Sequence, residues 1–255
     1  VVRNRFDRQV LAAAGEAGVS TVAALDPGDS GLAGFEDWQR TAGPAPDTAL
    51  EPDDLSIIMH TSGTTAAPKG AMMRHADLMF NVTAAINAHQ FRPDDVHLLV
   101  NPMFHCTALY SSLPTAAYQK STVVITADTG AENLMSLVQR ERITTFLSIP
   151  SIFQRIVALP DIEQYDASCL RLMAYAGSPM PVSTIRLLQR HFPDVELHNF
   201  FGLTETISMT HVLTGEEAEE RPDSIGRLLP FVEARTVDDR NRPCDPGAVG
   251  ELLFA

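Results

Sequence analysis

The chain has 255 residues, of which 45% are hydrophobic and 20% charged, so it can form one large globular domain or two small ones. Its formal net charge of -13, with scattered Lys and Arg, argues against nucleic-acid binding, which needs a concentrated basic face. Three widely separated cysteines show no zinc-like spacing and indicate a reducing compartment. We expect a cytoplasmic protein with no signal peptide and no transmembrane segment.

The first 54 residues predict an incomplete α/β piece followed by a linker. A helix is expected over 6–17 and a short strand over 20–25. Residues 26–54 are rich in Pro, Gly and Asp, which is typical of a loop.

From Leu55 onward, short β-rich runs alternate with amphipathic runs. The predicted strands are 55–59, 96–100, 122–125, 144–149, 170–175 and 195–200, and the predicted helices are 74–90, 132–142, 151–159 and 181–192, with 103–118 partly helical. Repeated strand–helix units predict an α/β fold with mostly parallel sheets covered by helices. We therefore assign 55–224 to an α/β core.

Residues 225–255 carry a different pattern and predict a smaller antiparallel β piece, with strands over 231–237 and 250–255. The chain starts at Val1 rather than at Met and stops at Ala255 inside the last predicted strand. We therefore expect a fragment of a longer protein.

The stretch from Thr61 to Gly70 follows the first strand of this core and is suited to polyphosphate binding. Hydroxyls and a flexible glycine precede one mobile cation in the run Thr61, Ser62, Gly63, Thr64, Thr65 and Lys69. The run is not a Walker loop, because Pro68 replaces a glycine and Gly70 replaces the hydroxyl that would hold Mg²⁺. A polar surface turn is the alternative interpretation.

The stretch from Asn199 to Thr206 forms a second candidate ligand site. Phe201 offers an aromatic face to a purine, Thr204 a hydroxyl to a phosphate, and Glu205 a carboxylate to Mg²⁺. The alternative is a helix start, with Thr204 as the cap and Glu205 in the first turn.

Two further stretches also follow predicted strands. In 176–179, Gly177 would let a flat ligand approach the backbone, although a plain strand-to-helix turn is the alternative. In 102–105, His105 could orient a carboxylate, although a lone histidine is commonly structural. Ligands of open α/β sheets bind outside the carboxyl ends of the strands, so we expect all four stretches to converge on one cleft.

Taken together, these stretches resemble the acyl-adenylate-forming family, which includes acyl-CoA synthetases, aryl-CoA ligases, luciferases and peptide-synthetase adenylation domains. The resemblance covers the chain from about Leu55 and includes T-S-G-T-T-x-x-P-K-G, P-x-F-H, A-G-S-P, F-G-x-T-E-T, the run 225–227 and the closing G-E-L, in the family's order. Two of the family's usual residues differ, with Ala66 in place of a glycine and Phe201 in place of a tyrosine.

The resemblance implies ATP, Mg²⁺ and coenzyme A as cofactors. It implies ATP contacts from Thr61, Ser62, Gly63, Thr64, Thr65, Lys69, Gly177, Ser178, Pro179, Asn199, Phe200, Phe201, Gly202 and Thr204, a metal ligand in Glu205, and catalytic roles for Lys69, His105, Thr204 and Glu205. The reaction implied is attack of a carboxylate on ATP to give acyl-AMP, followed by thioester formation with coenzyme A.

Amino-acid-activating relatives usually carry an aspartate where this chain has His105, so a fatty or aryl acid is favoured over an amino acid. The family's ribose-binding aspartate and C-terminal catalytic domain would lie beyond Ala255, so we expect the fragment alone to be nearly inactive. The alternatives are a catalytically weak nucleotide-binding remnant, an adenylation domain for another acid class, and a different ATP-dependent ligase or kinase.

Overall fold

The computed structural model describes residues 2–3, 7–19, 22–26, 32–41, 43–44, 47–61, 68–207, 209–215 and 217–254. The chain divides into two compact units, residues 1–50 and 51–255. None of the described helices is long and apolar enough to cross a membrane.

The first unit contains a three-stranded parallel sheet in the order β1-β2-β3 and two helices. Its elements are β1 (Val2–Arg3), α1 (Asp7–Glu16), β2 (Ala23–Asp26), β3 (Ala33–Gly34) and α2 (Phe35–Thr41). The prediction of a linker over 26–54 is therefore wrong at β3 and α2. Helix α2 has acidic residues in its first turn and Arg40 in its last, a charge order that suits the helix dipole. The surrounding Pro and Gly obscured that signal.

The second unit is organised around a seven-stranded sheet in the order β12-β11-β10-β9-β8-β6-β7. The strands are β6 (Val96–Leu99), β7 (Thr122–Ile125), β8 (Thr145–Ser148), β9 (Leu172–Tyr175), β10 (Glu196–Phe201), β11 (His211–Thr214) and β12 (Arg227–Leu228). The strands from β6 to β10 pair in parallel, whereas β11 and β12 are antiparallel additions that the sequence did not predict.

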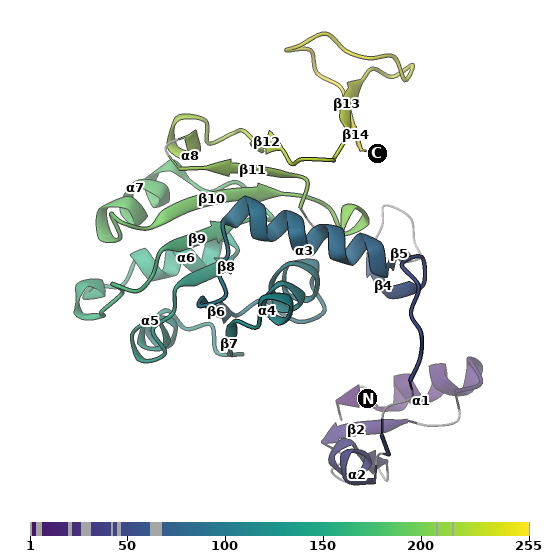
Figure 1. The fold of residues 1–255 in the computed structure, drawn as a ribbon. Helices are drawn as coiled ribbons and strands as arrows, with labels where there is room; N and C mark the ends of the chain where they lie inside the picture. The colour runs from purple at the N-terminus through teal and green to yellow at the C-terminus, as the bar shows by residue number, and fades with distance from the viewer. Residues whose placement is uncertain are drawn as a thin grey trace. The chain divides into compact units, whose positions relative to one another are not determined.

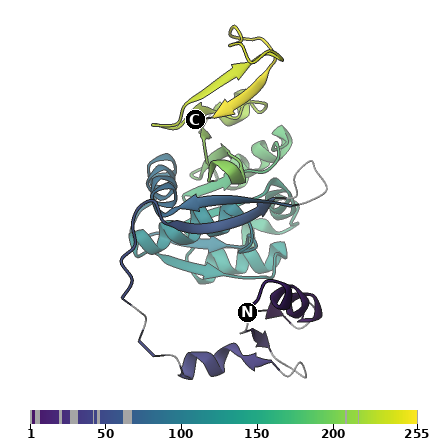
Figure 2. The same cartoon turned by 90° about the vertical axis from the view of Figure 1, so that its right-hand side faces the viewer.

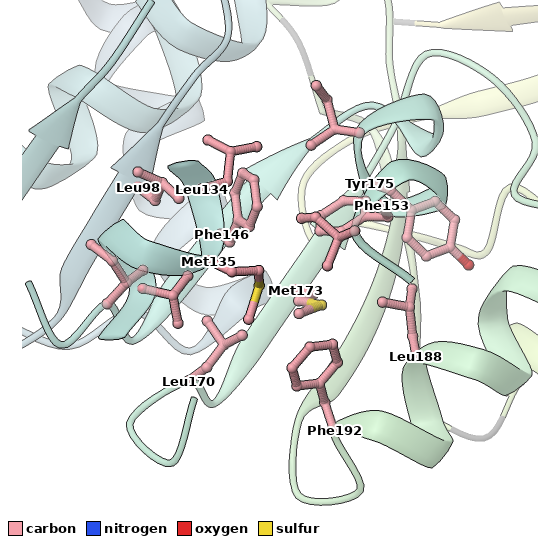
Figure 3. Packing of buried hydrophobic residues seen from close by; sticks show 14 of the residues in the cluster. Leu98, Leu134, Met135, Phe146, Phe153, Leu170, Met173, Tyr175, Leu188 and Phe192 are labelled. Atoms are coloured by element: carbon pink, nitrogen blue, oxygen red, sulfur yellow. The ribbon is translucent and has the colours of Figure 1, made fainter. Parts of the chain in front are cut away.

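Helices cover both faces of this sheet (Figure 1). One face is covered by α5 (Ala131–Arg140), α6 (Pro150–Val157) and α7 (Val182–His191), and the other by α3 (His75–His89) with the adjoining η2 (Thr107–Ser112) and α4 (Leu113–Gln119). Strand β9 is buried on both faces, as parallel strands usually are. Figure 3 shows Phe146, Phe153 and Met173 packed together within the larger core cluster. The predicted α/β fold is confirmed.

The remaining short helices are η3 (Ile162–Gln164), η4 (Thr204–Thr206) and α8 (Glu217–Glu220). Strands β13 (Ala234–Val237) and β14 (Glu251–Phe254) pair antiparallel, which confirms the predicted C-terminal β piece.

A separate two-stranded sheet holds β4 (Leu55–Thr61) and β5 (Lys69–Arg74), which run antiparallel (Figure 2). The strand predicted over 55–59 and the helix predicted over 74–90 are both present, but β5, which was not predicted, lies between them. The side chains of β4 alternate, so Met59 is buried while Ile58 is 50% exposed. Strand β5 was missed because its own sequence offers only one inward apolar anchor, Met73, and its pairing depends on β4.

Two histidines meet in the core between α3 and β10. The Nδ1 atoms of His89 and His198 lie 3.0 Å apart, and both rings are buried. One nitrogen must donate and the other accept, so the contact requires at least one neutral ring. Burial, with the neighbouring imidazole and Arg171, holds the pKa of His89 well below 6.5, and burial also lowers the pKa of His198 despite Glu196 at 3.4 Å.

This pair predicts acid-sensitive stability. Because the folded-state pKa values lie below the unfolded value of 6.5, stability is fully present above pH 6.5 and is lost as pH falls through it toward the folded pKa values. Each proton contributes a slope of up to about 1.4 kcal/mol per pH unit. We expect urea unfolding between pH 5 and 8 to show this slope, and the double variant His89→Gln/His198→Gln to reduce it. His60→Gln, which removes an exposed imidazole, is the control, and an unchanged slope in the double variant would contradict the assignment.

Candidate active site

The carboxyl edge of the large sheet contains a topological switch point. From β6 the chain goes to β7 on one side and then crosses to β8 on the other. The two sides of this opening are joined by side chains, since Ser148 Oγ donates to Asn101 Oδ1 at 3.3 Å and Asn101 Nδ2 donates to the Leu147 carbonyl at 3.2 Å. Open α/β sheets bind ligands at such points. Neither Asn101 nor Ser148 was singled out from sequence, because their importance depends on strand order.

His105 lies at this edge, immediately before the helix that follows β6. Its side chain is exposed and its ring packs against Phe104 with centroids 5.4 Å apart. The His105 carbonyl accepts hydrogen bonds from the amides of Ala108 and Leu109 at 3.1 and 3.0 Å. The backbone of His105 is thus fixed by the first helical turn while its imidazole remains accessible.

The end of β9 brings Gly177, Ser178 and Pro179 to the same edge, and all three are exposed. Tyr175 of β9 is paired with Asn199 of β10, so the residues that follow each strand are neighbours. Gly177 has φ = +88°, which only glycine adopts readily, and a Cβ there would have only the Ile149 side chain within 4 Å, at 3.8 Å. The space in front of Gly177 is otherwise open.

Strand β10 turns alternate side chains to opposite faces, which separates its two aromatic residues. Phe200 is 3% exposed and packs in the core beside α3, so its ring does not face the sheet edge. Phe201 is half-buried and has ring contacts with His211 and Phe254, at centroid distances of 6.0 and 6.4 Å. Asn199 Nδ2 donates to the Ser224 carbonyl at 3.2 Å. After Phe201, the half-buried Gly202 turns the chain toward η4.

Helix η4 holds Thr204 and Glu205 in an unexpected way. Thr206, not Thr204, provides the cap, because its Oγ1 accepts from the Leu203 amide at 2.9 Å. Within the described part of the chain, the side chains of Thr204 and Glu205 form no hydrogen bond or ion pair. Both are therefore available to a ligand.

Glu205 borders a pocket of about 350 Å³. The pocket is lined mainly by apolar side chains from β5, α3, η4 and the residues after it, the connection between β12 and β13, and β14. The lining residues are Met72, Asp77, Phe80, Glu205, Thr206, Ile207, Met209, Thr210, Phe231, Val232 and Phe254. Its other carboxylate, Asp77, is bonded to Arg74, which lowers the pKa of Asp77. Glu205 is thus the carboxylate of this pocket without a cationic partner among the described residues.

The predicted phosphate loop joins β4 to β5, so it is not at the carboxyl end of a parallel strand as expected. Ser62, Gly63, Thr64, Thr65 and Ala66 lie outside the described residues.

The described ends of that loop, Thr61 and Lys69, are opposite each other in the strand register. Lys69 is exposed and forms no ion pair with the described residues. The inner face of the two strands packs on Tyr110 of η2 and on Ile207, the residue after η4. The contact therefore involves residues close in sequence to three of the four predicted stretches.

The run 225–227 has a structural role. Gly226 has φ = +95°, and a Cβ there would lie 2.3 Å from the backbone C and O atoms of Val212. Only glycine lets β12 approach β11 this closely.

Comparisons with known proteins identify the family and the fold. The sequence model of the family described as "AMP-binding enzyme" matches residues 3–255 of this chain. Indoleacetate–CoA ligase of Aromatoleum aromaticum is 30% identical over 99% of this chain and 49% of its own length, and feruloyl-CoA synthase of an Amycolatopsis species is 32% identical over 82% of this chain and 42% of its own. The chain thus spans about half the length of the curated relatives it matches.

The N-terminal domain of FACL13 from Mycobacterium tuberculosis superimposes with a TM-score of 0.85 at 24% identity, over 97% of this chain and 66% of that one. This likeness shows the fold.

The close approach at Gly226 gives a stability prediction. Gly226→Ala should destabilise the protein by about 2–4 kcal/mol, because backbone overlap adds to the cost of positive φ. Gly215→Ala is the matched control, since Gly215 also has positive φ but nothing lies within 4 Å of its Cβ position. It should cost about 1 kcal/mol. Urea unfolding measures both, and equal losses would show that the contact with Val212 is unimportant.

Proposed function

We infer the function of this chain from its family, because the chain belongs to the AMP-binding enzymes. We propose that the protein activates a carboxylic acid with ATP, releasing pyrophosphate and forming acyl-AMP, and then transfers the acyl group to the thiol of coenzyme A. The observation that carries this proposal is the packing of β4 and β5 against Cys106, which follows His105, and against Ile207, which follows η4. It supports a site in which the phosphate-loop ends, His105 and Glu205 act on one ligand.

In the first step, a carboxylate oxygen of the substrate bonds to the α-phosphorus of ATP and pyrophosphate leaves. The charge on the phosphates rather than covalent chemistry is the main obstacle, so stabilisation must come from fixed cations and donors. Lys69 supplies an ammonium that has no ion-pair partner among the described residues, and Thr61 and Thr204 supply hydroxyls. We assign the same task to Ser62, Gly63, Thr64 and Thr65 of the loop.

Glu205 would hold Mg²⁺, which neutralises phosphate charge when it is bound. The carboxylate has the chemistry that Mg²⁺ prefers and has no protein cation to compete for it among the described residues. No three described His, Cys, Asp or Glu side chains gather as a metal site. Phosphate oxygens and water would complete the coordination, as is usual for this ion.

The nucleotide would lie along the ends of β9 and β10. The open space at Gly177 admits a flat base close to the backbone, beside Ser178 and Pro179. Phe201 offers a stacking face, while contact from Phe200 would have to come from its main chain, since its ring is in the core. Asn199 and Gly202 would shape the turn between them.

The apolar surface at the sheet edge favours a hydrophobic acid. Phe104 is 76% exposed, Ile149 48% and Leu203 44%, and all three follow strands of the same edge. Exposed apolar groups along one edge of a sheet support a binding surface there. The relatives named above are a ligase of indoleacetate and a synthase of feruloyl-CoA. We propose an aryl or fatty acid as the substrate, with His105 beside its carboxylate, and a cytoplasmic location.

A nucleotide-binding remnant of low activity is the second candidate. Ala66 favours it, because alanine where the family usually has glycine costs about 1 kcal/mol if the loop needs positive φ. Binding of ATP without turnover would distinguish this candidate from the first.

The activity is tested by carboxylate-dependent exchange of labelled pyrophosphate into ATP, on this chain and on the longest natural protein that contains it. Lys69→Ala and Glu205→Gln should each lower the exchange rate by about 10²–10³, because each removes a charge that stabilises the transition state. Lys120→Asn and Glu220→Gln are the matched controls, since both residues are exposed and outside the site.

Exchange that survives both Lys69→Ala and Glu205→Gln would overturn the site. No exchange with any acid, from a protein that binds ATP, would favour the remnant.

Substrate class is tested with 3-phenylpropionate and phenylalanine, which differ only in the α-ammonium. We expect kcat/KM to be at least about 10² higher for 3-phenylpropionate, because no carboxylate stands at position 105 to pair with the ammonium. A preference for phenylalanine would instead identify an amino-acid-activating enzyme.

A further inference from the structure

The helix that follows His105 is irregular at its centre. It runs over residues 106–119, but the part in η2 is a π-helix, in which the Leu113 amide bonds to the Ala108 carbonyl five residues earlier. Such a turn holds one more residue than an α-helical turn and is common at functional sites. It therefore rotates the residues before it by about 100° relative to a regular helix.

Pro114 accounts for the irregularity. In a regular helix the Tyr110 carbonyl would accept a hydrogen bond from the amide of residue 114. Proline has no amide hydrogen, and its ring collides with the carbonyl four residues before it. Widening the helix relieves that collision, but Pro114 itself offers no amide to the Tyr110 carbonyl.

Asn81 of α3 supplies a donor from its side chain. Its Nδ2 donates to the Tyr110 carbonyl at 2.7 Å, and the residue is 2% exposed. Its Oδ1 has no hydrogen-bond partner among the described residues. A buried amide with one unpaired atom is costly, so its bond to Tyr110 explains its presence better than general packing does.

The two ends of this helix have different surroundings. At the carboxyl end, Gln119 Nε2 donates to the Phe91 carbonyl at 2.8 Å, which fixes α4 to the body of the unit. At the amino end, the His105 carbonyl accepts the hydrogen bonds of the first helical turn from the amides of Ala108 and Leu109, at the sheet edge. The π-helix between them sets the direction in which the first turn faces the candidate cleft.

We propose that Asn81 is a positioning residue for acid recognition. With Tyr110 and Pro114 it forms a clamp that fixes the orientation of His105 and the first helical turn toward the carboxylic acid. This inference rests on the proposed function and assigns no contact between Asn81 and any substrate.

A thermal double-mutant cycle tests the clamp without an activity assay. Asn81→Leu should lower Tm by roughly 3–8 °C, because it removes a buried hydrogen bond to the Tyr110 carbonyl. In the Pro114→Ala background the restored amide can pair with Tyr110, so the same change should cost less than about 2 °C. Asn81→Asp, which keeps the shape but loses the donor, serves if Asn81→Leu does not fold, and Asn87→Leu on the exposed face of α3 is the control. Equal losses in the two backgrounds would overturn the clamp.

Pyrophosphate exchange tests its role in recognition. Pro114→Ala should raise KM for the acid by about tenfold while KM for ATP stays within twofold, since the phosphate-loop ends are on β4 and β5. A general loss of structure would raise both constants or lower only kcat, and that result would overturn the positioning role.

The same assay separates failure of the clamp from failure of the proposed function. If the unaltered protein shows no exchange with any acid, the proposed function is overturned. The role of Asn81 in acid recognition is then overturned as well. Normal exchange without coupling between Asn81 and Pro114 would overturn the clamp alone.

Discussion

The pairing of β6 with β8 is the constraint on which the rest of the site depends. The chain must visit β7 before returning to β8, so the loops after β6 and β8 leave the sheet on opposite sides of an opening. Asn101 and Ser148 tie those loops together across it. All side chains of β8 are buried, so the sheet edge cannot shift without disturbing both cores. The candidate site therefore rests on a rigid base.

The sequence predicted the elements that carry their own periodic signal and missed those that depend on a distant partner. Strand β7 was predicted at its observed bounds, 122–125, because Thr, Val and Ile favour a strand locally. Strand β5 was not predicted, since only its pairing with β4 makes it a strand. Phe200 and Phe201 face opposite sides because side chains alternate along a strand, which the sequence can predict. The hydrogen bond from Asn81 to Tyr110 spans 29 residues, and no local sequence pattern predicts it.

The titratable groups divide into structural and candidate catalytic sets at opposite ends of the strands. His97 and His198 lie within β6 and β10, and Arg171 precedes β9 while bonding to Asp95 at 2.9 Å. Burial lowers the pKa of His97, and hydrogen bonds from Arg171 and from the Arg92 amide keep the pKa of Asp95 low against its desolvation. These groups find their partners inside the protein. Lys69 and Glu205 have no charged partner among the described residues, as is expected of groups that bind a charged ligand.

The resemblance to the family implies a tyrosine where this chain has Phe201, and the two residues would hold an aromatic face in different ways. A phenol can fix its ring by a hydrogen bond, whereas Phe201 must rely on packing. Phe201, His211 and Phe254 form a closed set of ring contacts, with His211 and Phe254 5.9 Å apart. Burial lowers the pKa of His211, so its ring stays neutral and its edge-on contact with Phe201 does not vary through the neutral range. Strand β14, which supplies Phe254, thereby becomes part of the support for the nucleotide face proposed at β10.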